Sequence, residues 1–270
     1  MASIYTHFIF GQEVLKKLPS KFRNIIEKHI DYYILGQQGP DFFYFYKPYT
    51  NKGSKIGSEI HQSTFENFIN RSKKSLKDPC EEQLAYLFGF LCHFALDIMV
   101  HPYVNNLEVE LQLSHMEIET ELDRYYMIQK RRIPYEVETY KLIPNDITIS
   151  EKISPIFSDY DNGDTSLVKK SIQDFYKYKK LLHSPTRNKE KLIFFTMKRL
   201  GLYNKFKGQV LTHMPDKRAS ISNEVLSKRF NEAIPVAVHL IDNYYNYQIY
   251  NGRLSHYFNY NFSGIQLKSI

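Results

Sequence analysis

The chain has 270 residues, 43% of them hydrophobic and 24% charged, which is ordinary for a globular protein and enough to bury a substantial core. Its formal net charge of +7 favours anionic partners such as phosphates, acidic lipid surfaces or nucleic acid, and selects none of them. Two cysteines exclude a disulfide framework. We find no signal peptide and no apolar run as long as a bilayer span, so we expect a cytoplasmic protein.

Most of the chain is predicted to be helical. Apolar residues recur at helical spacing in five segments, at residues 22–34, 81–100, 108–130, 165–182 and 222–252. The second segment is apolar on almost every side, so we expect a central helix there. The expected N-caps are Thr165 or Ser166 and Ser222, and Pro235 is expected to kink or split the last helix.

Two regions interrupt the helical pattern. Residues 35–57 hold several glycines and prolines and are expected to be a long, functional connection. Residues 139–164 end in SDYDNGDT, which we interpret as a turn. The chain is therefore predicted to be one all-α domain, residues 1–270. Its metal-ligand half is residues 1–130, and residues 131–270 form a helical scaffold whose tyrosine-rich end packs against the domain.

Polar residues in the apolar segment 89–104, GFLCHFALDIMVHPYV, point to a metal site. His93, Asp97 and His101 follow one another at intervals of four residues, so they project from one side of a helix. Pro102 disfavours helical geometry at His101, which is expected to lie at the helix end. One such residue would be a satisfied core group, but three at this spacing favour a metal, because a buried charge needs a strong partner.

Further candidate ligands lie on both sides of this segment. His115 and Glu119 repeat the spacing of four that lets two side chains hold one ion. His61 begins a helical pattern after the glycine-bearing connection, Asp41 lies within that connection, and His7 lies just before the first helix.

A set of motifs carries a family resemblance. THFIFG, GQQGPDFFYFY, IHQSTF, HFALDIMVHPY and HMEIE together span residues 5–119. In this order they closely resemble the bacterial zinc-dependent phospholipase C family, which includes uncharacterised intracellular relatives. Zinc nucleases that act on single strands share its all-helical fold. The resemblance implies a single multi-helix domain of this type.

The resemblance also implies two or three zinc ions. The first would be held by His61, His93 and Asp97 with Asp41 beside them, the second by His101, His115 and Glu119, and the third by His7 and a shared Asp97. Asp41 would act as a metal ligand, a general base, or both. Secreted members complete the third site with an N-terminal Trp that this chain lacks, so that site would need another donor, such as the amine of Ala2 after removal of Met1.

The implied activity is hydrolysis of a phosphate ester by a zinc-bound hydroxide. Phe42, Tyr44 and Tyr46 follow Asp41 and would line the substrate pocket. The expected partner is a phosphate ester, including a phospholipid head group, with transient contact to a membrane surface. One alternative is a nuclease or nucleotidase on the same fold, with nucleic acid as substrate. Another is a catalytically silent, metal-stabilised binding protein.

Overall fold

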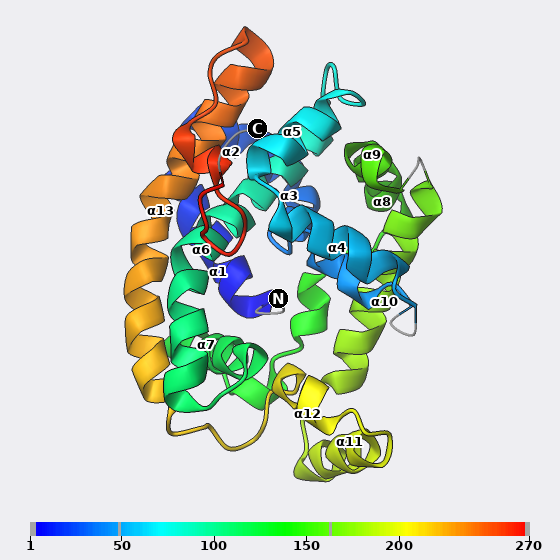
Figure 1. The fold of residues 1–270 in the computed structure, drawn as a ribbon, viewed down its shortest axis with the longest axis vertical. Helices are drawn as coiled ribbons and strands as arrows, with labels where there is room; N and C mark the ends of the chain where they lie inside the picture. Colours follow the sequence, from blue (N-terminus) through cyan, green and yellow to red (C-terminus); the bar gives the residue numbers. More distant parts are fainter. Residues whose placement is uncertain (1–3, 48–49, 162–163, 268–270) are drawn as a thin grey trace.

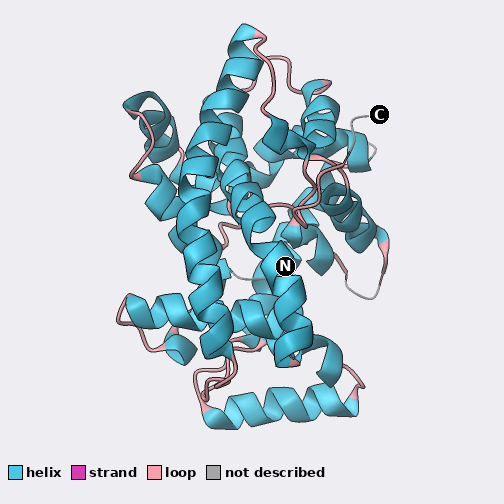
Figure 2. Cartoon of the chain, turned by 60° about the vertical axis from the view of Figure 1, so that its left-hand side comes forward, coloured by secondary structure: helices cyan, strands magenta, loops and turns pink. Residues whose placement is uncertain are grey.

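The fold is built from helices. The structure is a computed structural model that describes residues 4–47, 50–161 and 164–267, and within these ranges it contains no strand (Figure 1; Figure 2). The α-helices are α1 (Ile4–Leu15), α2 (Ser20–Lys28), α3 (Ile30–Gly36), α4 (Lys52–Gln62), α5 (Phe65–Lys73), α6 (Glu81–Leu111), α7 (His115–Gln129), α8 (Ile147–Ile153), α9 (Ser158–Asp161), α10 (Thr165–Leu182), α11 (Arg187–Arg199), α12 (Tyr203–Phe206) and α13 (Ala219–Tyr250). Short 3-10 helices join them: η1 (Asp41–Phe45), η2 (Pro134–Glu136), η3 (Thr139–Leu142), η4 (Ser154–Phe157), η5 (Lys207–Gln209) and η6 (His256–Asn259). The all-α prediction is confirmed.

Helix α6 is the centre of the molecule. It has 31 residues, and apolar side chains cover nearly its whole circumference, so it is buried on most sides. The long helix α13 runs along it, and α1, α2 and α3 also pack against it (Figure 1). The predicted central helix is therefore confirmed, and it extends further than expected, to Leu111.

The length and composition of α6 meet the requirements of a membrane span, contrary to our expectation from the sequence. In the structure, however, 94% of its most apolar stretch is buried inside the protein. This burial is typical of a core helix. The cytoplasmic location stays a prediction.

The expectation that α6 ends at His101 is wrong. The helix continues through Pro102 and ends before Gln112, whose φ is 52°. Proline lacks the N–H that would bond to the carbonyl of Ile98. The C-terminal segment covers this spot so closely that a Cβ on Gly264 would lie 2.6 Å from both that carbonyl oxygen and the proline ring. Tertiary packing thus outweighs the local preference of proline.

Two predicted helices are each divided. Residues 22–34 form α2 and α3 because His29 leaves the helical conformation, with φ −127° and ψ 45°. Residues 108–130 contain the end of α6 and all of α7. Ser114 caps α7 by accepting a hydrogen bond from the amide of Glu117, whose side chain accepts one from the amide of Ser114. This S-x-x-E capping box is a local sequence signal for a helix start, although residue 115 was not among the predicted starts.

The predicted N-caps of the later helices are wrong. Thr165 and Ser166 are the first two residues of α10, behind Asp164. Ser222 is buried in the first turn of α13 instead of preceding it. Pro235 does not split α13, because the helix packs along α6 over much of its length.

The regions predicted to be irregular contain helices. Within residues 35–57 lie η1 and the start of α4, so the connection is shorter than expected. His61 lies in the last turn of α4 instead of at a helix start, and His7 lies inside α1 instead of before it. The predicted turn SDYDNGDT begins with α9, and its residues 162–163 lie outside the described ranges.

The tyrosine-rich end packs against the rest of the protein, as expected. Phe258 and Phe262 are buried, and the ring centroid of Phe262 lies 5.1 Å from that of Phe94 on α6. One cluster of buried apolar side chains draws on both halves of the chain. The prediction that residues 1–270 form a single domain is not tested by these observations.

Candidate metal centre

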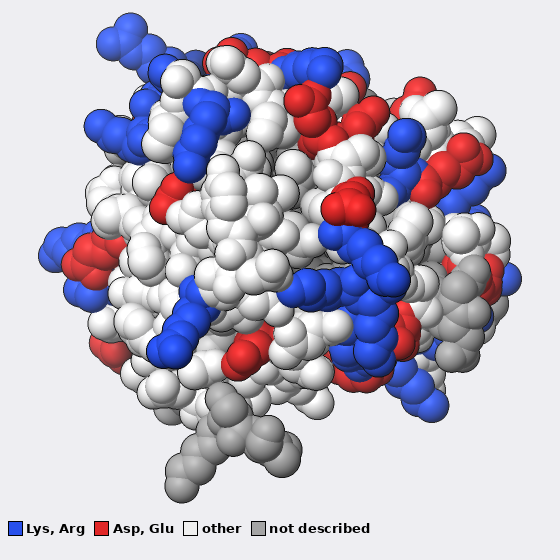
Figure 3. All heavy atoms as spheres, turned by 90° about the horizontal axis from the view of Figure 1, so that it is seen from above, with Lys and Arg blue, Asp and Glu red and all other residues white. Residues whose placement is uncertain are grey.

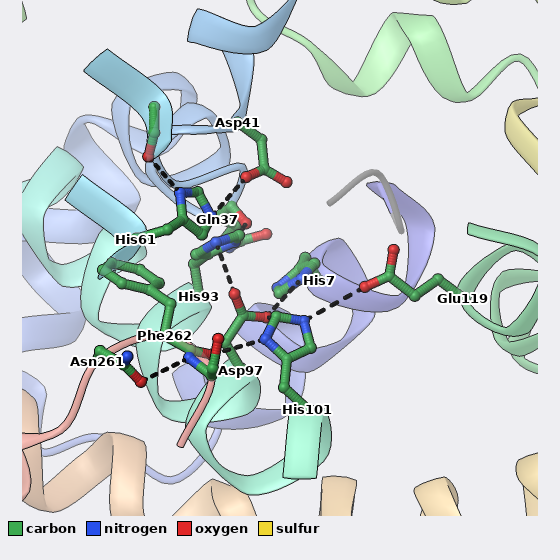
Figure 4. Close-up of polar contacts among 12 residues, drawn as sticks. His7, Gln37, Asp41, His61, His93, Asp97, His101, Glu119, Asn261 and Phe262 are labelled. Atoms are coloured by element: carbon green, nitrogen blue, oxygen red, sulfur yellow. Dashed lines mark hydrogen bonds and ion pairs between the residues drawn. The ribbon is translucent and has the colours of Figure 1, made fainter. Parts of the chain in front are cut away.

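Eight histidine and carboxylate side chains from separate parts of the chain meet around the middle of α6 (Figure 4). They are the eight candidates chosen from the sequence: His7 on α1, Asp41 on η1, His61 on α4, His93, Asp97 and His101 on α6, and His115 and Glu119 on α7. Six of them are buried, and His61 and His115 are partly exposed.

Asp97 is the hub of this cluster. Its Oδ2 lies 3.2 Å from Nε2 of His93, and its Oδ1 lies 3.5 Å from Nε2 of His7 and 3.6 Å from Nε2 of His101. The spacing of four places one histidine a turn before Asp97 and the other a turn after it. One carboxylate therefore faces three imidazoles.

The remaining candidates extend the cluster in two directions. Nε2 of His61 lies 3.1 Å from Oδ1 of Asp41. On the other side, Oε1 of Glu119 lies 3.5 Å from Nε2 of His101 and 3.0 Å from Nε2 of His115.

Three groups of ligand atoms lie within 4.8 Å of one another: His7, His93 and Asp97; Asp41, His61 and His93; and His101, His115 and Glu119. The last group is the one expected for the second ion. The first expected set differs, because Asp41 and not Asp97 joins His61 and His93. Asp41 on η1 lies 3.1 Å from His61, whereas the oxygens of Asp97 face two histidines of α6 and one of α1.

Backbone carbonyls fix three of the imidazoles. Nδ1 of His61, His93 and His101 lies 2.7, 3.2 and 2.6 Å from the carbonyl oxygens of Gly57, Gln37 and Phe262. In each ring Nδ1 is therefore placed to donate, and Nε2 faces the centre. This arrangement is the usual support of metal-binding histidines.

The centre holds its carboxylates as anions. Burial acts to raise the pKa of Asp97, but His101, His93 and His7 lower it well below the usual value. Burial also acts to raise the pKa of Asp41, and nearby positive charge including His61 brings it down to about 2. Burial and the neighbouring His93 lower the pKa of His7 to about 3, so this ring is neutral. Neutral imidazole and ionised carboxylate are the forms that bind metal.

Several buried atoms in the centre have unused hydrogen-bonding capacity. Nδ1 of His7, Nε2 of His93 and Oδ2 of Asp97 are buried and form no hydrogen bond among the described residues, although the last two lie 3.2 Å apart. Each such atom costs about 1–3 kcal/mol unless something compensates. A coordinated cation would compensate Nε2 of His93 and Oδ2 of Asp97, so the residues present fit a metal.

The donor set suits zinc. It offers imidazole nitrogen and carboxylate oxygen, which zinc accepts in four-coordinate sites. The nearest thiol candidate, Cys92, is buried at 3.2 Å from the Tyr33 hydroxyl, and burial raises its pKa to about 12. It is the core thiol that we expected and contributes no thiolate.

The three predicted pocket aromatics lie in different surroundings. Phe42 is fully buried against Phe43 and Phe157, so the structure places it in the core and not in a pocket. Tyr44 is partly buried, with its hydroxyl 3.3 Å from Nδ1 of His61. Tyr46 is also partly buried, beside Lys47.

A family comparison agrees with this geometry. The sequence model of zinc-dependent phospholipase C matches residues 6–192, which is more than two thirds of the chain. The chain belongs to the zinc-dependent phospholipase C family. Neither the curated proteins nor the solved structures include a significant match to it.

The family is zinc-dependent, and the side-chain groups of this cluster could bind metal. All eight candidate ligands lie within the matched range, whereas Phe262, which fixes His101, lies beyond it. Sequence reasoning missed this contact, since nothing local marks a backbone carbonyl 161 residues away. The proposed contribution of Ala2 to a third site concerns a residue outside the described ranges.

Proposed function

We propose that the chain is a zinc-dependent phosphodiesterase, related to phospholipase C, that hydrolyses a phosphate ester. The observation that carries the proposal is Asp97, a buried carboxylate that faces three imidazoles within 3.6 Å. An arrangement of this kind is costly without cations and is stabilised by them.

Two or three zinc ions would occupy the three groups of ligands. The ions supply Lewis-acid activation of water and neutralise charge on the phosphate. His101, His115 and Glu119 would hold one ion and His7, His93 and Asp97 another, and the second oxygen of Asp97 would serve a neighbouring ion.

Asp41 orients the attacking water in this proposal. Its low pKa makes it an anion throughout the neutral range, so it accepts a hydrogen bond from water. The Nε2 of His61, 3.1 Å from Oδ1, holds the carboxylate toward the other ligands. Asp41 therefore acts as both ligand and positioning group.

The nuclease alternative receives no specific support. On the one face seen in Figure 3, a few basic side chains lie side by side right of the centre, but they form no stripe across the face. The proposed substrate is a small or lipid phosphodiester, and transient contact with a membrane surface stays part of the proposal.

The test compares metal content and hydrolysis in matched variants. Elemental mass spectrometry is expected to find two or three zinc ions per chain, with hydrolysis of bis(p-nitrophenyl) phosphate or p-nitrophenyl phosphorylcholine. Asp97→Asn removes the bridging charge and is expected to lower zinc content and to reduce hydrolysis about 100-fold. Glu110→Gln, on the exposed side of the same helix, should change neither.

Two outcomes would contradict the proposal. A chain that purifies without metal and cannot be reconstituted with zinc would exclude a zinc hydrolase. Full zinc binding without hydrolysis of either ester would instead favour a silent, metal-stabilised binding protein.

A further inference from the structure

A small cavity beside the metal centre contains a buried lysine. The cavity has a volume of about 40 Å³, and its lining includes Ile4, Thr120, Asp123, Lys179 and Gln209. About 10–15 Å³ of such volume holds one water, so the space admits a group of a few heavy atoms such as a carboxylate or a phosphoryl group.

The cavity lies about one helical turn from the candidate zinc ligands. Asp123 follows Glu119 by four residues on α7, and Ile4 precedes His7 by three residues on α1. Residues at these spacings share a helix face, about 5 Å apart along the axis. The Lys179 ammonium is near enough to the centre for Asp41 and Glu119 to act on its pKa, so a short side group on a substrate held at the metals would extend toward the cavity.

Lys179 brings a positive charge into this cavity. Its side chain is 7% exposed, and Nζ donates a hydrogen bond to Oε1 of Gln209 at 2.5 Å. Nζ also lies 5.6 Å from the centroid of the Phe45 ring. A buried ammonium that contacts an amide oxygen and an aromatic ring is still costly, and an anion would compensate it further.

The carboxylate of Asp123, which also lines the cavity, accepts hydrogen bonds from α1. Asp123 accepts hydrogen bonds from the amides of Tyr5 and Thr6, at 3.2 and 2.7 Å, and from the Thr6 hydroxyl at 2.7 Å. It thereby caps the first turn of α1. Burial lowers the pKa of Lys179 to about 8, while Asp123, Asp41 and Glu119 act to raise it, so the ammonium form dominates at neutral pH.

We propose that the cavity around Lys179 is a subsite for an anionic group carried by the substrate. The inference rests on the proposed function and names its substrate class: phosphate esters with a second negative charge near the phosphate. A choline ester carries a cation and would face the lysine ammonium. A buried ammonium attracts an anionic side group and repels a cationic one, so we predict that the anionic ester binds about tenfold or more tightly than the cationic ester.

The test measures binding of three phosphate monoesters to the zinc-loaded protein by calorimetry. The probes are 2-phosphoglycolate, ethyl phosphate and phosphorylcholine, whose side groups are anionic, neutral and cationic. The protein should bind 2-phosphoglycolate about tenfold more tightly than phosphorylcholine. Lys179→Met should abolish this preference. Lys180→Met, an equal loss of charge at the exposed neighbouring position, should retain it.

The binding preference and the hydrolysis of diesters are separate readouts. If the preference is present but no diester is hydrolysed, the anionic subsite stands and the proposed catalysis fails. The inference is overturned if phosphorylcholine binds as tightly as 2-phosphoglycolate, if 2-phosphoglycolate does not bind, or if Lys179→Met keeps the preference in a folded protein.

Discussion

At the residue scale, the position of His93 depends on a glycine. Gly39 has φ +53°, and a Cβ there would lie 2.3 Å from Cδ2 of the His93 ring. Gly39→Ala is therefore expected to displace this ring and to weaken zinc binding about 10–100-fold, in addition to a backbone cost of about 1–2 kcal/mol. Zinc competition with a chromophoric chelator and thermal unfolding measure the two effects.

Gly201 provides the matched control for this substitution. Its φ is +67°, and no atom lies within 4 Å of a Cβ built there. Gly201→Ala should cost similar backbone stability while zinc affinity stays unchanged. Equal zinc affinities in the two variants would refute the role of Gly39.

At the element scale, the C-terminal segment after η6 supports the metal centre. The carbonyl of Phe262 accepts a hydrogen bond from His101 on α6, and its amide donates one to the carbonyl of His61 on α4, at 3.2 Å. One residue thus links two helices that carry candidate ligands. Oδ1 of Asn261 accepts from the amides of Ser263 and Ile265, both at 3.0 Å, and shapes this turn.

Asn261→Ala is expected to release that turn. Loss of these hydrogen bonds should destabilise the protein by about 1–3 kcal/mol, and the loosened support of His101 should weaken zinc binding about tenfold or more. Asn243→Ala is the control, because Asn243 accepts from the amide of Ser255 and donates to the carbonyl of Arg253, anchoring the same segment away from the centre. If both variants bind zinc equally well, the segment is only structural.

At the scale of helices, part of the candidate site could be predicted from the sequence. The i, i+4 spacings predicted which side chains of α6 and α7 would lie together, because helix geometry fixes that locally. The extension of α6 past Pro102 and the contact between His101 and Phe262 could not be predicted, since both depend on a segment that folds back from the far end of the chain. The burial of Lys179 was also missed, because nothing in the sequence distinguishes it from its exposed neighbour Lys180 on α10.

At the scale of the whole molecule, the centre lies where elements that also share the apolar core meet. Ligand candidates come from α1, η1, α4, α6 and α7, and they bury three carboxylates near the middle of the fold. Without cations, these carboxylates repel one another, and buried atoms of His7, His93 and Asp97 keep unused hydrogen-bonding capacity. Bound zinc should therefore contribute to the free energy of unfolding of the whole chain.

Removal of zinc is accordingly expected to lower the melting temperature. Free zinc at 1,000 times its Kd stabilises the folded state by about 4 kcal/mol, and for a chain of this size each kcal/mol corresponds to about 2–4 °C. Differential scanning calorimetry with and without EDTA measures this difference, and EDTA already saturated with zinc is the control. Imidazole must be deprotonated to bind metal, and although burial acts to lower the pKa of His93 and His101, neighbouring carboxylates including Asp97 outweigh it and raise the pKa. The difference should therefore be larger at pH 8 than at pH 6 and should shrink further as the pH falls. An equal melting temperature with and without EDTA at pH 8 would show that bound zinc does not stabilise the fold.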